Sequence, residues 1–167
     1  RLKMVSPQTA AERIAEIINS LFFDVVTALF NHGGDLLKFG GDAMLGVFPG
    51  DTPEQMAESA LLAAQTGLAI QKVMEKYAEI DAAGEKRSLK IKCGIAAGPY
   101  FAAHIGTPPE PDKGQCGTMA YVTTGHTVNR TEVCQGYAAG GEVTLTQEVY
   151  DLISARVQAE PVETEGE

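Results

Sequence analysis

The stretch Gly33-Gly34-Asp35-Leu36-Leu37-Lys38-Phe39-Gly40-Gly41-Asp42-Ala43-Met44-Leu45-Gly46-Val47-Phe48 decides the fold. Two short apolar runs, residues 36–39 and 43–48, flank the triplet Gly40-Gly41-Asp42. Apolar runs separated by glycine and aspartate predict a β-hairpin. Glycine and aspartate are also ordinary turn residues, so a plain hairpin without any ligand explains the triplet equally well.

The same turn has the residue types that a nucleotide site needs. Gly40 and Gly41 allow a backbone to approach a polyanion closely. The carboxylate of Asp42 suits Mg²⁺, which prefers carboxylate and phosphate oxygens. Lys38, two residues before the glycines, can reach a base or a phosphate. From these five residues alone, the plain-hairpin interpretation is favoured, and the ligand-binding interpretation stays open as the alternative.

Helices are expected on either side of the hairpin. Apolar residues at steps of three and four predict a helix over 7–32, stopped by Gly33-Gly34. A second helix is expected over 53–77, with Thr52 as its N-cap. The further expectations are a polar loop (81–87), strands (89–97, 100–105), an exposed loop (107–117), a strand (119–124), a helix (125–138), a strand (142–145) and a helix opened by a threonine cap (146–156).

Hairpins mixed with crossover helices predict an α/β fold of the α+β sandwich type. Helices are expected on one face of the sheet, leaving the other face or an edge for a partner or ligand. The 167 residues suit one domain, and 44% apolar residues suffice for a core. The net charge of −9 argues against a dedicated nucleic-acid binder, which needs a basic face.

Cysteine and histidine positions give no sign of a disulfide framework or a metal cluster. The three cysteines, Cys93, Cys116 and Cys134, are odd in number and far apart, which predicts a reducing, cytoplasmic compartment. The three histidines are equally scattered. No apolar run approaches the ~20 residues that cross a bilayer, so no membrane segment is expected. The opening Arg1 indicates part of a longer chain.

Several motifs, in order, resemble the class III adenylyl and guanylyl cyclases. Residues 33–48 resemble the family's metal-binding hairpin, most of all in the soluble, bicarbonate-responsive adenylyl cyclase subgroup and its bacterial relatives. The segment Lys92-Cys-Gly-Ile-Ala-Ala-Gly98 is similar to the central strand. The segment Tyr121-Val-Thr-Thr-Gly-His-Thr-Val-Asn129 resembles the strand–glycine–helix segment, and Gly141-Glu-Val-Thr-Leu-Thr146 resembles the late strand. The matches run from about residue 9 to residue 153.

The resemblance implies a ferredoxin-like βαββαβ core that works as a dimer, homodimer or tandem pair, with sites at the seam. In this family the ribose 3′-hydroxyl of ATP or GTP attacks the α-phosphate, and two divalent ions, Mg²⁺ or Mn²⁺, are held by two aspartates. Asp42 matches the second metal aspartate and Lys38 the lysine that favours adenine, beside Gly40 and Gly41. Asn129 matches the asparagine that orients the ribose.

The departures from the family pattern are equally specific. The first metal aspartate would lie before the chain begins, in a Phe-x-Asp-Ile-like strand. Val133 stands at the transition-state arginine, and an apolar side chain cannot stabilise phosphate charge. Val122 stands at the second base contact, and Arg130 lies on a different helical face from Asn129. The expected domain is therefore residues 1–159, without its first strand and final hairpin, followed by an acidic tail or linker (160–167).

These losses predict the metal-donating half of a cyclase pair, whose partner supplies the arginine. A symmetric homodimer is then expected to be nearly inactive. A regulatory pseudo-cyclase that keeps the fold and makes no product is the main alternative. A diguanylate cyclase of the GGDEF type fits worse, because Ala43-Met44 replaces Glu-Phe. A non-enzymatic module with structural glycines is the last alternative.

Overall fold

The computed structural model describes residues 7–82, 85–109, 112, 114 and 117–162. The helices are α1 (Pro7–Asn31), α2 (Pro53–Met74), the 3₁₀ turn η1 (Glu75–Tyr77), α3 (His126–Gly136) and α4 (Gln147–Ile153). The strands are β1 (Asp35–Gly40), β2 (Ala43–Val47), β3 (Ile80–Ala82), β4 (Glu85–Arg87), β5 (Cys93–Ile95), β6 (Phe101–Thr107), β7 (Thr118–Thr124) and β8 (Val143–Leu145). The predicted α/β fold is confirmed.

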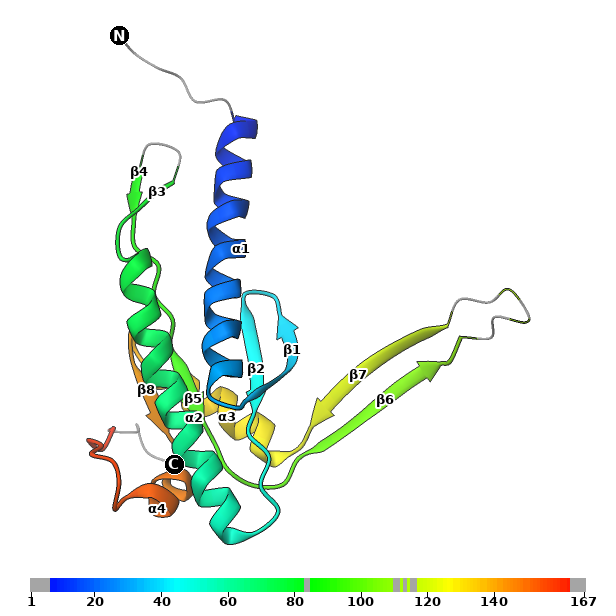
Figure 1. Cartoon of the computed structure of the whole chain (residues 1–167), viewed down its shortest axis with the longest axis vertical. Coiled ribbons are helices and arrows are strands. Elements are labelled where there is room, and N and C mark those ends of the chain that lie inside the picture. The colour runs from blue at the N-terminus through cyan, green and yellow to red at the C-terminus, as the bar shows by residue number, and fades with distance from the viewer. Residues whose placement is uncertain (1–6, 83–84, 110–111, 113, 115–116, 163–167) are drawn as a thin grey trace.

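The described strands pair two by two. The pairs β1–β2, β3–β4 and β6–β7 are antiparallel hairpins, and β5–β8 is parallel. Antiparallel pairing therefore dominates, as expected, but the described strands form four separate two-stranded sheets. The two long helices, α1 and α2, run side by side along the body of the molecule (Figure 1).

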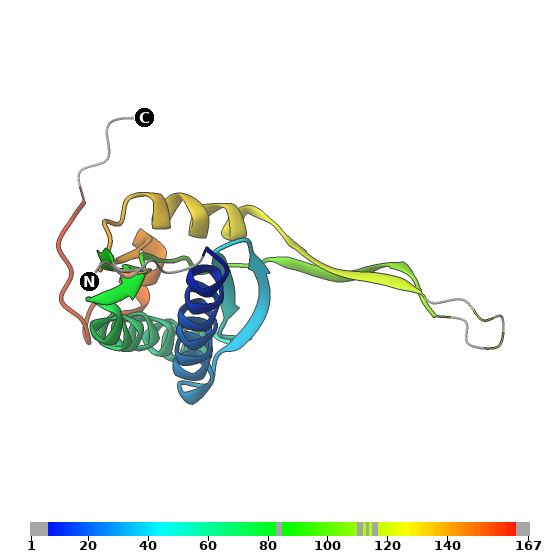
Figure 2. The same cartoon turned by 90° about the horizontal axis from the view of Figure 1, so that it is seen from above.

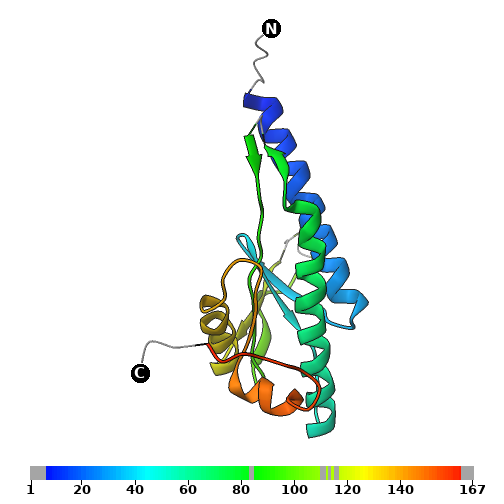
Figure 3. The same cartoon turned by 90° about the vertical axis from the view of Figure 1, so that its left-hand side faces the viewer.

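Helices cover both faces of the β5–β8 pair. Cys93 and Ile95 pack against clusters that involve α1, α2 and α4. Gly94, which points the opposite way in an alternating strand, faces α3: a Cβ there would lie 2.3 Å from the backbone nitrogen of Gln135. Figure 3 shows the strands between α2 and α3. The expectation of helices on one face is corrected here, because α3 returns across the opposite face of β5.

Two apolar clusters hold these layers together. One joins α2 to α4 through Ala60, Ala64, Val149 and Ile153, and Leu145 of β8 packs against it. The other joins α1 to α2 through Val25, Ala28 and Ile70, with Met44 of β2 and Cys93 of β5 at its border. The small side chains on α2 allow close helix packing, and the alternation of strands and helices brings distant residues into one core.

The predicted start of α2 is confirmed in detail. The hydroxyl of Thr52 accepts a hydrogen bond from the Gln55 amide at 3.3 Å, and the Gln55 side chain accepts one from the Thr52 amide at 3.3 Å. This reciprocal pair is a capping box. Thr146 likewise stands at the N-cap of α4, but in the described part of the chain its hydroxyl makes no capping hydrogen bond.

Two expectations differ from the structure. Within residues 81–87, expected as a loop, Asp81 and Ala82 belong to β3 and Glu85–Arg87 to β4, and Asp81 pairs with Lys86 across the strands. Opposite charges stabilise such a pair without any apolar alternation for sequence analysis to detect. The strand expected over 89–97 is only Cys93–Ile95, the residues that find partners in β8. Cys116 and four further residues of the expected loop 107–117 (110, 111, 113 and 115) lie outside the described residues.

The statement that no apolar run could cross a bilayer is also corrected. Within α1, Ala11–Asn31 is long and apolar enough by length and composition, with a mean hydropathy of 1.4. Sequence inspection missed this because isolated polar residues interrupt the run. The helix lies near the start of the chain, and 17% of the window is buried inside the protein. The core helix of a soluble protein passes the same test.

The β6–β7 hairpin projects from the body as an arm (Figures 1 and 2). Its strands pair continuously from Phe101 with Thr124 to Thr107 with Thr118. Gly125 joins the arm to α3 with a φ of 132°, a backbone conformation that favours glycine. The arm thus leaves the body beside the start of α3.

Candidate functional site

The predicted site residues at the β1–β2 hairpin lie on a tight turn. Gly40 pairs with Ala43, so Gly41 and Asp42 form a two-residue loop. Gly41 has a φ of 65°, a conformation that favours glycine. A Cβ added at Gly40 or Gly41 would meet no atom within 4 Å. The turn therefore leaves open space next to the Asp42 carboxylate, with room for a bulky anion.

Lys38 and Asp42 are both exposed on this hairpin. Among the contacts between described residues, neither side chain has a hydrogen bond or an ion pair, so both are available to a ligand. Lys38 pairs with Leu45 across the hairpin, just beyond a break in register between Leu36 and Lys38. Asp42 stands in the turn and Lys38 on the strand before it, so the hairpin presents one carboxylate and one ammonium group to solvent.

The fit to a divalent ion is partial. Asp42 supplies one hard oxygen donor beside open space, and Mg²⁺ is often held by one or two carboxylates together with substrate phosphates. In the part of the chain that the structure describes, no group of three His, Cys, Asp or Glu side chains is placed to hold a metal. Asp42 therefore fits as one ligand of a shared site, and the hairpin does not form a metal site alone.

Asn129 lies elsewhere in the molecule. It is exposed in the first turns of α3, and its amide donates a hydrogen bond to the Gly125 carbonyl at 3.2 Å. Helix α3 begins away from the tip of the β1–β2 hairpin (Figures 1 and 3). No hydrogen bond between described residues joins Asn129 to Lys38 or Asp42. Asn129 and the hairpin residues Lys38 and Asp42 therefore lie apart within one copy of the domain (Figures 1 and 3).

The residues that depart from the family pattern have clear structural positions. Val133 lies one turn after Asn129 on the same helical face and is 59% exposed. Arg130 forms an ion pair with Glu148 of α4, which holds the pKa of the Glu148 carboxyl below its usual range. Arg130 is therefore engaged within the body, and its charge is balanced there. Val122 is half-buried on β7, opposite Ala103.

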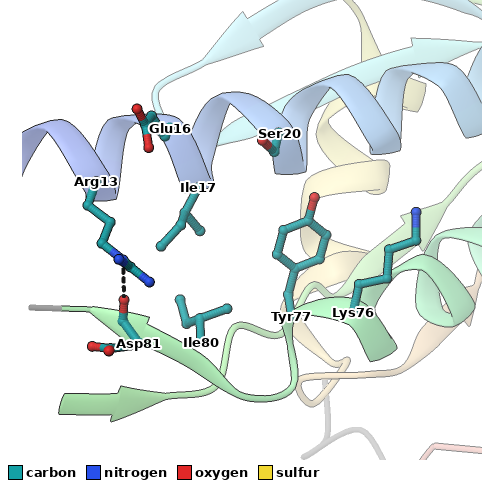
Figure 4. A pocket seen from close by; sticks show the side chains of 8 residues that line it. All are labelled: Arg13, Glu16, Ile17, Ser20, Lys76, Tyr77, Ile80 and Asp81. Carbon is teal, nitrogen blue, oxygen red and sulfur yellow. Dashed lines mark hydrogen bonds between the residues drawn. The ribbon is translucent and has the colours of Figure 1, made fainter. Parts of the chain in front are cut away.

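A larger hollow lies between α1 and the β3–β4 hairpin, away from these residues (Figure 4). Its volume is about 550 Å³, and its lining residues are Arg13, Glu16, Ile17, Ser20, Lys76, Tyr77, Ile80 and Asp81. Arg13 donates from Nε to the backbone oxygen of Asp81 at 3.2 Å. The two cations are matched by two carboxylates, so the hollow favours neither an anion nor a cation. It contains none of the predicted site residues.

Comparison with known proteins gives consistent relatives. The chain is 27% identical over 143 residues to adenylate cyclase type 10 of Mus musculus, covering 85% of this chain and 8% of that protein. The adenylyl cyclase CyaB from P. aeruginosa has a similar structure, with a TM-score of 0.70, 24% identity, and 88% of this chain and 71% of that chain covered. The catalytic core of a rhodopsin-guanylyl cyclase with converted specificity was solved with ATPαS and also has a similar structure. Its TM-score is 0.69 at 20% identity, and the match covers 95% of this chain and 76% of that chain.

These structural likenesses establish the fold, and the family is established by a separate match. The family model described as "Adenylate and Guanylate cyclase catalytic domain" matches residues 2–166. That range includes the β1–β2 hairpin, the arm and α3, which carry all the predicted site residues. The chain therefore belongs to the adenylate and guanylate cyclase catalytic domain family.

Proposed function

We propose that this domain converts ATP to 3′,5′-cyclic AMP and pyrophosphate as the metal-donating half of a cyclase pair. The observation that carries the proposal is the exposed, unpartnered Asp42 beside the open Gly40-Gly41 turn. In this reaction the ribose 3′-oxygen bonds to the α-phosphorus, the bond from that phosphorus to the β-phosphate bridging oxygen breaks, and the 3′-hydroxyl proton leaves. Divalent ions, when bound, would neutralise charge on the phosphates.

Each residue has a proposed role that its position supports. Asp42 holds one side of the metal site, and the glycines give the triphosphate room. Lys38 donates a hydrogen bond to the adenine base in the other half-site of the pair, which favours ATP over GTP. Asn129 orients the ribose in the other half-site of the pair. Similar cyclase structures were solved with ATPαS and with GTP, so the choice of ATP rests on Lys38.

The partner in this proposal is a second cyclase-type domain that supplies the transition-state arginine. Two observations support the need for it. Val133 presents an apolar side chain where the arginine would act, and Arg130 is held by Glu148. Asn129 and Asp42 also lie apart within one copy (Figures 1 and 3), which supports a site completed by groups from two domains.

The test is calorimetric titration with an α,β-methylene ATP analogue in the presence of Mn²⁺. We expect binding by the wild type and at least about tenfold weaker binding by Asp42→Ala, because one carboxylate ligand is lost. Asp51→Ala is the matched control, since Asp51 is exposed on the loop before α2 and should bind as the wild type does. Equal affinity of the wild type and Asp42→Ala for the nucleotide analogue, or binding of the analogue without Mn²⁺, would contradict the proposed role of the hairpin.

A regulatory pseudo-cyclase is the second candidate function. The apolar Val133 at the arginine position favours it as much as it favours the metal-donating half of a cyclase pair. The two candidate functions can be distinguished by measuring cyclic AMP after the domain is mixed with a second cyclase domain. This second domain has the arginine and lacks its own metal aspartates. A metal-donating half restores cyclic AMP production in the mixture, and its Asp42→Ala variant does not. A pseudo-cyclase gives no product in either mixture, even where it binds the nucleotide.

A further inference from the structure

Helix α3 follows the arm directly (Figure 2), and Asn129 lies in its first turns. Residues two positions apart in a helix differ by about 200° around its axis, so Thr127 and Asn129 lie on nearly opposite faces. Thr127 is half-buried and Asn129 is exposed, as this geometry requires. The direction of the Asn129 side chain therefore depends on how the first turn of α3 is rotated about the helix axis.

The later turns of α3 are held by close contacts with the body. A Cβ at Gly94 of β5 would lie 2.6 Å from the Thr131 carbonyl oxygen and 2.3 Å from the Gln135 backbone nitrogen, so α3 lies directly on the β5 backbone. The buried Thr144 hydroxyl donates a hydrogen bond to the Cys134 carbonyl at 2.7 Å, which ties the end of α3 to β8. These contacts lie after the first turn of α3, so the first turn needs a contact of its own.

A hydrogen bond from Thr127 holds the first turn of α3. The N-cap residue, Gly125, provides no side-chain hydrogen bond to this turn. The Thr127 hydroxyl donates to the carbonyl of Pro99, between β5 and β6, at 2.7 Å. Gly98, with a φ of 144°, lies so close that a Cβ there would be 2.8 Å from the Thr127 hydroxyl oxygen. The start of α3 is thus joined to the segment that leads from β5 into the arm.

We propose that Thr127 is a positioning residue for the nucleotide: its hydrogen bond to Pro99 sets the rotation of the first turn of α3 and thereby directs Asn129 toward the ribose. The proposal rests on the proposed function, which assigns the ribose to Asn129. Without this bond the first turn can rotate or fray, because no side-chain cap holds it. Thr127 lies on the inner face of α3 and acts through Asn129, without touching the nucleotide or the metal ion itself.

The test is a double-mutant cycle on the full chain, read by calorimetric titration with the α,β-methylene ATP analogue in Mn²⁺. We expect Asn129→Ala to weaken binding about fivefold, as the loss of one hydrogen bond does. Thr127→Val removes the hydroxyl, keeps the side-chain shape and should weaken binding to a similar degree. Thr127→Ser keeps the hydroxyl and should bind within about twofold of the wild type. The double variant Thr127→Val/Asn129→Ala should bind no more weakly than Asn129→Ala alone, because Thr127 acts through Asn129.

Thr131→Val is the matched control in the same helix. The Thr131 hydroxyl donates to the Thr127 carbonyl at 2.9 Å, so its hydrogen bond lies within α3 and does not reach the arm segment. This variant loses the same group one turn later and should bind the analogue within about twofold of the wild type. Circular dichroism verifies that each variant keeps its helical content.

The proposal is overturned if Thr127→Val binds as the wild type does, if its loss adds in full to that of Asn129→Ala, or if Thr131→Val loses as much affinity. Asn129→Ala that binds as the wild type does would overturn it too, because Thr127 would then have no contact to direct. Asp42→Ala distinguishes these failures from a failure of the proposed function, since metal-dependent binding through Asp42 can persist in each of them.

Discussion

At the scale of single residues, Val133 is the most informative position for activity. It continues the exposed face of α3 that begins with Asn129, and Tyr137, 47% exposed, follows one turn later. A long cation at position 133 would extend into solvent or into a partner domain without displacing the core. Position 133 therefore lacks the positive charge of the family's arginine, although the fold leaves room for an arginine side chain there.

Val133→Arg is expected to raise cyclic AMP formation from Mn²⁺-ATP at least about tenfold, since arginine stabilisation of phosphoryl-transfer charge is worth still larger factors. The free energy of unfolding should change by less than about 0.5 kcal/mol, because the site is exposed. Tyr137→Arg is the control, with the same charge one turn further along. Equal activity of both variants and the wild type, with nucleotide still bound, would argue for the pseudo-cyclase.

Cys93 is a half-buried thiol whose reactivity we expect to be low. Burial raises the pKa of Cys93 to about 11, although a hydrogen bond from Gln71 acts in the opposite direction. Because the thiolate is the reactive form, iodoacetamide at pH 8 should label Cys93 about 100-fold more slowly in the folded chain than in urea. Mass spectrometry of the Cys93 peptide measures this ratio. Equal rates would show that β5 opens readily.

At the scale of elements, β5 depends on a glycine for its contact with α3. The β5 backbone approaches α3 so closely that a Cβ at Gly94 would lie 2.3 Å from the Gln135 nitrogen and 2.6 Å from the Thr131 oxygen. Both are backbone atoms, which cannot rotate away. The helix and strand would have to separate to admit even one methyl group.

Gly94→Ala is therefore expected to lower the free energy of unfolding by about 1–3 kcal/mol, the usual cost of overpacking. Gly136→Ala is the matched control in α3, where a Cβ meets nothing within 4 Å. This control should be neutral or stabilising by up to about 1 kcal/mol, because alanine favours the helix. Urea denaturation followed by circular dichroism compares the two. Equal effects would mean that β5 and α3 are less closely packed.

At the scale of the whole molecule, Asp24 joins α1 to η1, the 3₁₀ turn that directly follows α2. Its carboxylate accepts hydrogen bonds from Lys76 Nζ at 3.1 Å and from the Tyr77 hydroxyl at 3.0 Å. The bond from Lys76, followed by that from Tyr77, lowers the pKa of Asp24. Burial, followed by the nearby Asp24 carboxylate, raises the pKa of Tyr77. The two long helices are thus linked by a charged contact beyond their apolar cluster.

A lowered pKa in the folded state makes this contact stabilising at neutral pH. The contribution is lost as the pH falls below about 4 and the carboxylate becomes protonated. Asp24→Asn should therefore reduce the free energy of unfolding at pH 7, by less than about 1 kcal/mol for so exposed a pair, and have little effect at pH 3. Denaturation at both pH values measures the difference, with Asp51→Asn as control. An equal loss at both values would exclude the ionised form as the cause.

The sequence by itself determined the local elements and the main chemical features. The β1–β2 hairpin was predictable because its turn and register depend on neighbours within sixteen residues, and the α2 cap depends on Thr52 and Gln55 alone. Ordered motifs around Lys38, Asp42 and Asn129 indicated the cyclase family, which the family match confirms. The roles of these residues remain predictions, because a role depends on a nucleotide and a partner as well as on the fold.

Only the tertiary structure decided how the elements meet. The sequence predicted helices on one face, whereas α3 packs against the back of β5, a contact between residues about forty positions apart. The pairing of Arg130 with Glu148 and the projection of the arm depend on equally distant contacts. Periodicity and turn chemistry report on neighbours along the chain, whereas long-range packing is selected by the free energy of the whole core.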